Sequence, residues 1–247
     1  MPFFDVIVVG LGQVGKPLLE LVERRYSAIG IDIEPVRGSA TCGILHICFP
    51  FSGKFVSAAV EYIKRYSPLL VIINSTVAPG TTRTIYSLTG ASLAYSPVRG
   101  KHIRMKQDLM RYRKYVGGID RESGARASEH FQSLGMKTKV LSSPETVELA
   151  KLTETTYFGV LIAWAQEVER YADQLHVDYE QVVSFYEEVP FFPPVTYVPG
   201  IIGGHCVMPN IRILQSVFRS GFLDAIVESN DTKIAQARAL SSTVKSA

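Results

Sequence analysis

The first 141 residues alternate short apolar runs with longer amphipathic stretches. The runs are short and rich in β-branched residues, which predicts strands at residues 4–9, 28–33, 44–49, 69–73, 93–95, 115–116 and 138–141. Helical spacing of apolar residues follows the first run and recurs at residues 55–66, after Pro79-Gly80, and at residues 121–134. Alternating strands and helices of these lengths predict an α/β fold with a parallel, doubly wound sheet, whose strands all end at one edge.

The pattern changes after Ser143-Pro144. From Pro144 to about residue 178, apolar residues recur at helical spacing, with Gly159 as the one glycine. Ser143 suits the N-cap of this helix and Pro144 its first position. A helix of about 34 residues is roughly 50 Å long. A small domain leaves part of such a helix uncovered, so we expect a homodimer through helix 144–178.

A loop rich in proline and glycine follows at residues 190–209, and two further helices end the chain. The sequence therefore predicts two domains. Residues 1–141 form an α/β domain that binds its ligand at the carboxyl ends of the strands. Residues 142–247 form a helical domain built on the one long helix.

Composition agrees with a globular protein. The chain has 247 residues, of which 47% are apolar and 20% are charged, and this excludes a disordered tail protein. The 26 basic and 23 acidic residues leave a net charge of only +3, which gives no indication of a DNA-binding protein. The densest basic run, residues 101–114, is typical of a solvated face, and contact with phosphates is the alternative.

Cysteine and histidine usage excludes two other classes. Three scattered cysteines, Cys42, Cys48 and Cys206, form no disulfide framework. The histidines lack the spacing of metal ligands, so we expect no metal: His46, His102, His130, His176 and His205. The chain opens without a signal sequence and has no apolar run long enough for a membrane span. We therefore expect a cytoplasmic protein without nucleic-acid or membrane partners.

Residues 10–15 read Gly-Leu-Gly-Gln-Val-Gly, a G-x-G-x-x-G motif between a predicted strand and a predicted helix. Asp32 ends the next strand, 22 residues after the first glycine. In this context the motif predicts a Rossmann-type dinucleotide site. A glycine-rich turn without a cofactor is the alternative.

Each position of the motif has a physical reason. Gly10 allows the tight turn, Gly12 lets the pyrophosphate approach the backbone, and Gly15 allows close packing of helix and strand. Gln13 and Val14 complete the turn, whose helix N-terminus attracts the pyrophosphate. The Asp32 carboxylate accepts hydrogen bonds from the ribose hydroxyls and repels a 2′-phosphate, which favours NAD over NADP. Arg37 weakens that preference, because a nearby arginine can accept the phosphate.

Two further segments carry candidate chemistry. Residues 74–82 follow the fourth strand, where the hydroxyls of Ser75 and Thr76 suit the nicotinamide end or an anionic substrate group; ordinary helix capping is the alternative. Residues 199–206 read Pro-Gly-Ile-Ile-Gly-Gly-His-Cys. Dense glycines expose backbone N–H groups beside Cys206, which makes this cysteine a candidate nucleophile. A small buried loop cysteine is the alternative, and His205 is as easily a structural loop residue as a ligand contact.

Together these segments resemble the nucleotide-sugar 6-dehydrogenases, the family of UDP-glucose, GDP-mannose and UDP-N-acetylmannosamine dehydrogenases. The matching motifs stand in the family's order along essentially the whole chain: residues 10–15, Asp32, residues 75–82 (Ser-Thr-Val-x-Pro-Gly-Thr-Thr), Ser96-Pro97, Ala150-Lys151-Leu152, residues 203–206 (Gly-Gly-His-Cys) and Asn230-Asp231. The chain ends near the point where the family's C-terminal nucleotide-binding domain would begin. The resemblance therefore suggests a short member, with a second chain as a possible source of that domain.

The resemblance implies roles for particular residues. Family members use NAD to oxidise a sugar C6 alcohol twice, through a thiohemiacetal and a thioester on a cysteine, which here would be Cys206. Lys151 would stabilise the developing alkoxide or transfer its proton. Thr76 would lie near the nicotinamide and a bound water. Asn210 stands where the family has a catalytic aspartate.

Several family positions are changed. Val98 replaces the glutamate after Ser-Pro, Thr155 an asparagine, Asn210 the aspartate, and Pro50-Phe51 a proline-threonine pair. The loss of two carboxylates suggests altered chemistry, such as a single two-electron oxidation or another alcohol substrate. A non-catalytic NAD-binding paralogue or subunit is the first alternative function. The second is a β-hydroxyacid dehydrogenase-like enzyme acting on a small hydroxy acid, in which Cys206 has no role.

Overall fold

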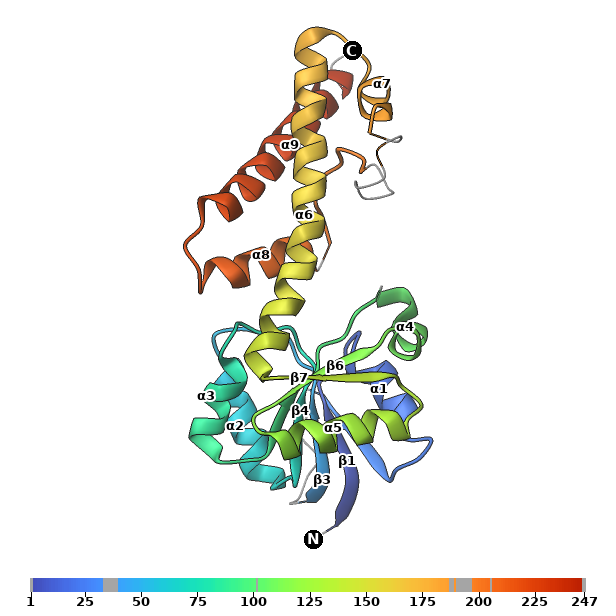
Figure 1. Ribbon diagram of the computed structural model, residues 1–247, viewed down its shortest axis with the longest axis vertical. Helices are drawn as coiled ribbons and strands as arrows, with labels where there is room; N and C mark the ends of the chain where they lie inside the picture. The colour runs from blue at the N-terminus through green and yellow to red at the C-terminus, as the bar shows by residue number, and fades with distance from the viewer. Residues whose placement is uncertain are drawn as a thin grey trace. The chain divides into compact units, whose positions relative to one another are not determined.

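The computed structural model describes residues 2–32, 40–100, 102–186, 189, 197–204 and 206–245. By its internal contacts the chain divides into two compact units, Met1–Lys151 and Leu152–Ala247 (Figure 1). The predicted boundary at residue 141 falls ten residues earlier, because the first turns of the long helix pack with the first unit. Val147, for example, belongs to one of that unit's apolar cores.

Seven strands form a single sheet in the described part of the first unit: β1 (Phe3–Val9), β2 (Ala28–Ile31), β3 (Thr41–Ile47), β4 (Leu70–Ile73), β5 (Leu93–Tyr95), β6 (Lys114–Gly118) and β7 (Thr138–Leu141). Their order is β2-β1-β3-β4-β5-β6-β7. The strands β1 to β5 are mutually parallel, as the sequence predicts for a Rossmann-type sheet.

The prediction of an all-parallel sheet is wrong for one pair, because β6 runs antiparallel to β5. The chain between them forms a 3-10 turn, η1 (His102–Arg104), and the short helix α4 (Met105–Arg111). A helix of seven residues is about 10 Å long, too short to return the chain across the sheet. Strand β6 therefore starts at the edge where β5 ends, which brings Lys114 to the carboxyl edge of the parallel strands.

Helices cover both faces of the sheet (Figure 1). One apolar core lies between the sheet and α2 (Phe55–Tyr66) and α3 (Thr81–Thr89). The other lies between the sheet and α1 (Gly15–Val22), α4 and α5 (Arg121–Ser133). Alternate strand residues supply the two cores, as in Ile7 and Val9 on one face and Val6 and Val8 on the other.

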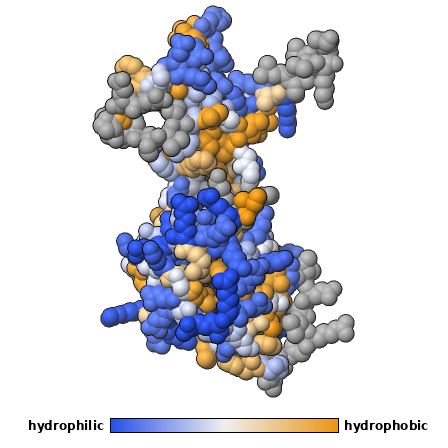
Figure 2. All heavy atoms as spheres, turned by 90° about the vertical axis from the view of Figure 1, so that its right-hand side faces the viewer, coloured by the Kyte–Doolittle hydropathy of each residue, from blue (hydrophilic) through white to orange (hydrophobic). Residues whose placement is uncertain are grey.

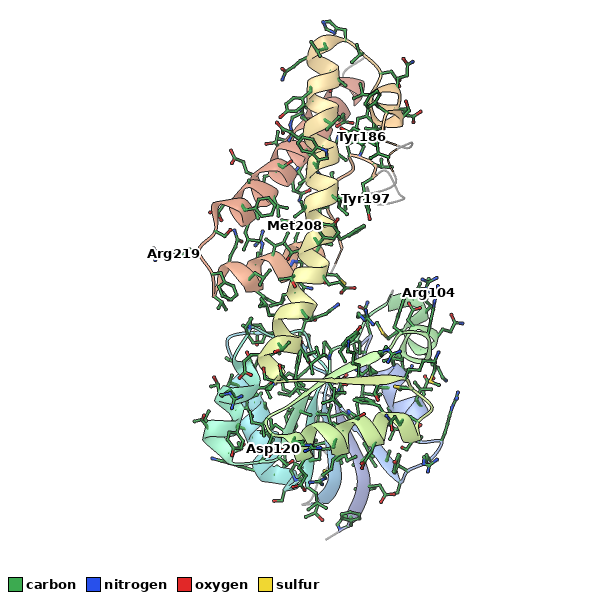
Figure 3. The ribbon with its side chains drawn as sticks, in the orientation of Figure 1. Arg104, Asp120, Tyr186, Tyr197, Met208 and Arg219 are labelled. Atoms are coloured by element: carbon green, nitrogen blue, oxygen red, sulfur yellow. The ribbon has the colours of Figure 1, made fainter. Side chains whose placement is uncertain are left out.

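A capping box begins α5. The carboxylate of Asp120 accepts a hydrogen bond from the Ser123 N–H at 2.7 Å, and the Asp120 N–H donates to Ser123 Oγ at 3.2 Å. Figure 3 labels Asp120 at this end of the helix. The reciprocal bonds satisfy two backbone donors and set the start of the helix close to the predicted residue 121.

The second unit is helical. The long helix α6 (Pro144–Leu175) begins in the first unit and continues here, followed by α7 (Tyr179–Ser184), α8 (Val207–Gln215) and α9 (Gly221–Lys245). A compact apolar cluster joins α6, α8, α9 and Ile202. The loop prediction for residues 190–209 is wrong at its end, since residues 207–209 lie in α8. The helices α4 and α7 were not predicted.

Gly159 explains how α8 packs on α6. A Cβ atom at this position would lie 2.8 Å from Cγ1 of Val207 and 3.3 Å from Cδ1 of Ile211. The lone glycine of α6 thus lets the start of α8 approach closely. This contact fixes the helix end that carries Cys206.

Within the part of the chain that the structure describes, no helix is long and apolar enough to cross a membrane. In the view of Figure 2, hydrophobic surface gathers on the helical unit, and the face of the first unit is mostly hydrophilic. The exposed Arg104, labelled in Figure 3, is the N-cap residue of α4.

Candidate functional site

The turn between β1 and α1 needs glycine at two places for reasons of packing. Gly10 has φ +89°, and a Cβ atom there would lie 2.6 Å from the backbone N of Phe49. At Gly15 a Cβ atom would lie 1.8 Å from the Gly10 carbonyl oxygen and 3.2 Å from Cβ of Cys48. Both glycines therefore keep α1 close to β1 and to the end of β3.

At Gly12, no packing contact requires a glycine. A Cβ atom at Gly12 would have nothing within 4 Å, and the residue is exposed. The neighbouring Gln13 is exposed, and Val14 is the N-cap of α1 without a side-chain cap. The first N–H groups of a helix have no acceptor within the helix. The open space at Gly12 and the start of α1 together fit a phosphate group of a dinucleotide.

Asp32 follows β2 and is exposed beside this turn. Its Oδ1 atom lies 3.4 Å from the backbone N of Leu11, which places the carboxylate next to the glycine-rich turn. A dinucleotide seated on the turn would bring its adenosine ribose to this carboxylate. Arg37 lies outside the described residues.

The turn between β4 and α3 contains Ser75 and Thr76. Ser75 is buried, and its hydroxyl donates to the Phe49 carbonyl oxygen at 2.6 Å. That proton is therefore engaged within the protein, and the Ser75 oxygen remains an acceptor. Thr76 is half-buried. Asn74, just before them, is structural, since its side-chain amide lies 3.0 Å from Nδ1 of His46 and donates to the Ile72 carbonyl.

The N-terminus of α3 is occupied by a carboxylate of the protein itself. Glu148 of α6 accepts hydrogen bonds from the N–H groups of Gly80 and Thr82 and from the Thr82 hydroxyl. Burial raises the pKa of Glu148, and the three hydrogen bonds oppose that shift. An anionic substrate group is therefore not needed to satisfy this helix end, and its cap comes from α6 rather than from residues 74–82.

A buried lysine supports the segment that follows β5, Ser96-Pro97. Lys114 is 3% exposed, and its Nζ atom donates to the carbonyl oxygens of Ser96 at 2.6 Å and Pro97 at 3.0 Å. The ring of Phe131 lies 4.7 Å from Nζ. Burial lowers the pKa of Lys114 to about 7. The expectation of a solvated basic run is therefore wrong for Lys114, which is its buried end.

Two buried histidines continue this polar cluster. His46 Nε2 lies 2.9 Å from His130 Nε2, and Asn74 bonds the other nitrogen of His46. Because the Asn74 amide donates, His46 Nδ1 is the acceptor and His46 Nε2 carries the proton. Burial lowers the pKa of both imidazoles, that of His130 to about 4. The nearby Cys48 thiol has its pKa raised to about 12 by burial. Burial thus favours the neutral form of His46, His130 and Cys48.

Val98 packs against the apolar core beside α1 and α5. An apolar side chain here fills part of that core, whereas a glutamate would bring a charge to it. The family glutamate is thus replaced by a residue without acid–base chemistry. The hydroxyl of Ser96, two residues earlier, donates to the Tyr115 carbonyl at 2.8 Å.

The helical unit contains the other candidate residues. Cys206 is the N-cap of α8 and is half-buried, and Asn210 lies one helical turn later. The backbone N–H of Asn210 donates to the Cys206 carbonyl at 3.1 Å. The spacing of four residues therefore places both side chains on one side of α8. His205 lies outside the described residues, and Thr155 is half-buried on α6.

Two polar side chains hold the segment before Cys206. Asn230 of α9 accepts from the Ile202 N–H at 2.7 Å and donates to the Ile202 carbonyl at 3.3 Å. Gln166 of α6 donates to the Gly200 carbonyl at 2.7 Å. Tyr197 packs its ring against Phe158 of α6, 5.4 Å between centroids (Figure 3). These contacts fix both ends of the glycine-rich segment.

The structure thus arranges the candidates in two groups. In the first unit, the glycine-rich turn, Asp32 and the turn with Ser75 and Thr76 follow the parallel strands β1, β2 and β4, and Lys151 lies on α6. In the second unit, Cys206 and Asn210 share the start of α8. Within the described residues, no group of three or more His, Cys, Asp or Glu side chains could hold a metal ion.

Sequence reasoning missed Glu148, Lys114, Gln166 and Asn230 as side chains that shape the site. The sequence did indicate that Glu148 is buried, because Glu148 lies on the same side of α6 as Leu152, which is fully buried. A similar indication exists for Lys114, which stands at the start of a strand-like run. In both cases the partners are distant in sequence and no motif identifies them.

Comparison with known proteins decides the relationship. Residues 145–232 match the model of the UDP-glucose/GDP-mannose dehydrogenase family, central domain. Residues 145–232 therefore form a domain of this family. The match covers nearly all of α6, α8 and the first half of α9, and so includes the segment with Lys151 and Cys206.

Relatives extend the match to the first unit. UDP-N-acetyl-D-mannosamine dehydrogenase of Methanocaldococcus jannaschii is 25% identical over 253 residues, covering 82% of this chain and 59% of that protein. The chain thus spans about three fifths of that relative's length.

Solved structures share the fold. UDP-D-ManNAc dehydrogenase from Pyrococcus horikoshii superposes with a TM-score of 0.80 at 22% identity, covering 95% of this chain and 70% of that one. The 3-hydroxyisobutyrate dehydrogenase of Mycobacterium tuberculosis, in a structure with L-serine, has a TM-score of 0.72 at 16% identity. In that case the match covers 96% of this chain and 94% of the other.

Proposed function

We propose that this nucleotide-sugar dehydrogenase relative is an NAD-dependent oxidoreductase that oxidises a primary alcohol of a nucleotide sugar. The observation that carries the proposal is the glycine-rich turn. Gly12 faces open space at the start of α1, and the Asp32 carboxylate stands beside the turn. The names of the relatives point to a UDP-N-acetylmannosamine-type substrate.

The residues of this chain fit the cofactor. The backbone at Gly10, Gly12, Gln13, Val14 and Gly15 would hold the pyrophosphate, and Asp32 the adenosine ribose. When bound, a nicotinamide dinucleotide supplies the hydride acceptor. An exposed carboxylate at Asp32 repels a 2′-phosphate, so we propose NAD rather than NADP. Ser75 and Thr76 would face the nicotinamide end, and Arg37 remains a candidate contact to the ribose.

The chemistry then needs a group that handles the alcohol proton and, for a second oxidation, a nucleophile. We assign the first role to Lys151, which as an amine takes the hydroxyl proton and as an ammonium stabilises the alkoxide. Cys206 is the candidate nucleophile, since the N-terminal dipole of α8 favours negative charge there. Its sulfur adds to the aldehyde carbon to give a thiohemiacetal. Thr76 and Asn210 would hydrogen-bond the water and the reacting oxygens.

The lost carboxylates suggest that the reaction stops early. Hydrolysis of a thioester needs a base to activate water, and Val98 and Asn210 have none to offer. A thioester formed by a second hydride transfer would then stay on Cys206 and end turnover. We therefore propose that the released product is the aldehyde, from a single two-electron oxidation. The double variant Val98→Glu plus Asn210→Asp tests this idea, and acid product formed by the variant alone supports it. No gain of acid product from a folded variant argues against it.

A homodimer through α6 is supported by a row of exposed aromatic side chains. Tyr157, Trp164 and Tyr171 are 57%, 54% and 48% exposed and recur every seven residues. This spacing places them along one side of the helix, the pattern by which long helices pair.

The test is NADH formation from NAD with a panel of nucleotide sugars that includes UDP-N-acetylmannosamine. Wild type is compared with Cys206→Ala and Lys151→Ala, and each variant is checked for NAD binding. We expect NADH from wild type and none from Lys151→Ala. If Cys206 acts only after the aldehyde forms, Cys206→Ala keeps the first oxidation and loses any second one. Absence of turnover in wild type that binds NAD would favour a non-catalytic NAD-binding paralogue or subunit.

A second candidate function has one observation in its favour. The 3-hydroxyisobutyrate dehydrogenase structure is matched over 94% of its length, so this two-part fold occurs without a third part. A β-hydroxyacid dehydrogenase-like enzyme would use Lys151 and not Cys206. Small hydroxy acids therefore belong in the same panel, and their NAD-dependent oxidation by Cys206→Ala would select this alternative.

A further inference from the structure

Glu148 connects α6 to the turn before α3. The side chain is fully buried, at 0% exposure. Its Oε2 atom accepts from the Gly80 N–H at 2.7 Å. Its Oε1 atom accepts from the Thr82 N–H at 2.9 Å and from the Thr82 hydroxyl at 2.6 Å. Both carboxylate oxygens are therefore bound at the start of one helix.

The start of α3 has no cap of its own. Gly80 is the N-cap, with φ +90° and no side-chain hydrogen bond. The free N–H groups of a helix N-terminus attract an anion, and a cap from the same segment usually satisfies them. Here the anion comes from a helix that starts more than sixty residues later in the chain. These three hydrogen bonds of the Glu148 carboxylate, here called the tie, thus link α6 to the start of α3. Both elements contribute to the proposed site.

Each partner of this tie carries a candidate residue nearby. Lys151 follows Glu148 by three residues, which places both on one side of α6. Thr76 lies four residues before Gly80 in the turn that Glu148 holds. The hydrogen bonds of Glu148 to Gly80 and Thr82 hold the end of this turn next to α6.

We propose that Glu148 is a positioning residue for the proposed oxidation, whose carboxylate holds Lys151 in a fixed position relative to the turn that carries Thr76. The expected effect on catalysis rests on the proposed function. The hydrogen bonds between Glu148 and the start of α3 do not depend on that function. Glu148 itself touches neither substrate nor cofactor in this scheme.

The same two helices offer a matched control. Glu145, one turn earlier on α6, forms an ion pair with Arg83 of α3 at 2.6 Å. Both side chains are partly exposed, at 33% and 49%, so water screens the pair and its contribution is small. Glu145→Gln therefore removes a carboxylate between the same elements without removing the buried tie.

The first measurement follows the Lys151 amine directly. Lysines of wild type, Glu148→Ala, Glu148→Gln and Glu145→Gln are labelled with acetic anhydride, and mass spectrometry gives the rate at Lys151 relative to exposed Lys139. We expect Glu148→Ala to raise this ratio by roughly 3–10-fold, because the released helix turn opens locally. Glu145→Gln should leave it unchanged. Added acetate, a small carboxylate, should lower the ratio again in Glu148→Ala.

The second measurement is steady-state kinetics on the substrate found for wild type. A positioning role predicts a fall in kcat of about 100-fold in Glu148→Ala with little change in KM for NAD. Acetate should restore part of the rate. Glu148→Gln should be intermediate, since its amide keeps one acceptor oxygen but turns an N–H group toward an N–H donor of the turn.

An unchanged Lys151 labelling ratio in folded Glu148→Ala overturns the proposal. So does an equal rise at all lysines that acetate does not reverse, which is the result of general unfolding. If Glu148→Ala does not fold, Glu148→Gln decides by the same ratio. If the Lys151 labelling ratio shifts in Glu148→Ala but wild type shows no turnover, the positioning role of Glu148 is supported. Only the proposed function is then contradicted.

Discussion

At the scale of single residues, Lys114 makes the stability of the first unit depend on pH. Its pKa is about 7 in the folded chain and about 10.4 when unfolded. Between these values the unfolded state binds more protons, so the free energy of unfolding rises with pH. The contribution is at its lowest below pH 7, where the buried amine must carry its charge.

The variant Lys114→Met tests this dependence. The free energy of unfolding, measured by urea titration from pH 7 to pH 10, should rise more in wild type than in the variant. We expect the difference between the two to change by on the order of 2–4 kcal/mol over that range. Lys139→Met, at an exposed position, serves as the control. Parallel curves for wild type and Lys114→Met would show that the Lys114 amine is charged in the fold at pH 7–10.

The proposed preference for NAD over NADP rests on Asp32. Its exposed carboxylate lies where the ribose 2′ position is expected, so Asp32→Ser should lower the preference for NAD over NADP. We expect a change of about 10–100-fold in the ratio of the two dissociation constants, typical of one unit charge near another. Glu23→Gln, at the other end of α1, should leave the ratio unchanged. An unaltered ratio in Asp32→Ser would place selectivity elsewhere, with Arg37 as the next residue to test.

At the scale of elements, α6 combines a buried side with the exposed row Tyr157, Trp164 and Tyr171. Trp164→Glu places a charge in the middle of that row and should weaken the proposed dimer by about 2 kcal/mol or more, as for the loss of a central aromatic contact. Sedimentation velocity across a concentration series measures the dissociation constant. Gln174→Glu adds the same charge at an exposed α6 position outside the row. Monomeric wild type, or an unaffected Trp164→Glu dimer, would contradict an α6 interface.

Elements with a strong local pattern could be predicted from the sequence. The strand β5 at residues 93–95, helix α2 at residues 55–66 and the long helix from Pro144 follow from apolar periodicity and the N-terminal proline. The direction of β6 could not, because strand direction depends on the path of the preceding chain. That path includes the seven-residue α4, whose run of basic residues suggested only a solvated face.

Some features of the candidate site could likewise be predicted from the sequence, and others could not. The turn at Gly10–Gly15 could be predicted, since the restriction to glycine acts within a few residues. Gly10 and Gly15 are required by atoms of Phe49, Cys48 and each other. The roles of Glu148 and Lys114 could not, because their partners Thr82 and Ser96 are brought to them only by the fold.

At the scale of the whole molecule, each of the two units carries its own group of candidate residues. The first has the features of a dinucleotide site, and the second carries the cysteine. The M. jannaschii relative is longer, and this chain spans 59% of it. The 3-hydroxyisobutyrate dehydrogenase fold, in contrast, is matched almost completely. Cofactor binding is the step that the proposed oxidation requires first.

The measurement that tests the account most directly is calorimetric titration of the full chain with NAD, for wild type and Gly12→Val. Wild type should bind, and Gly12→Val should lose binding while its free energy of unfolding stays within about 0.5 kcal/mol, since the added side chain meets only open space. Gly221→Val, at another position with open space, should bind like wild type. Wild type that binds no NAD, or Gly12→Val that binds it equally well, would contradict the assignment of this turn as the cofactor site.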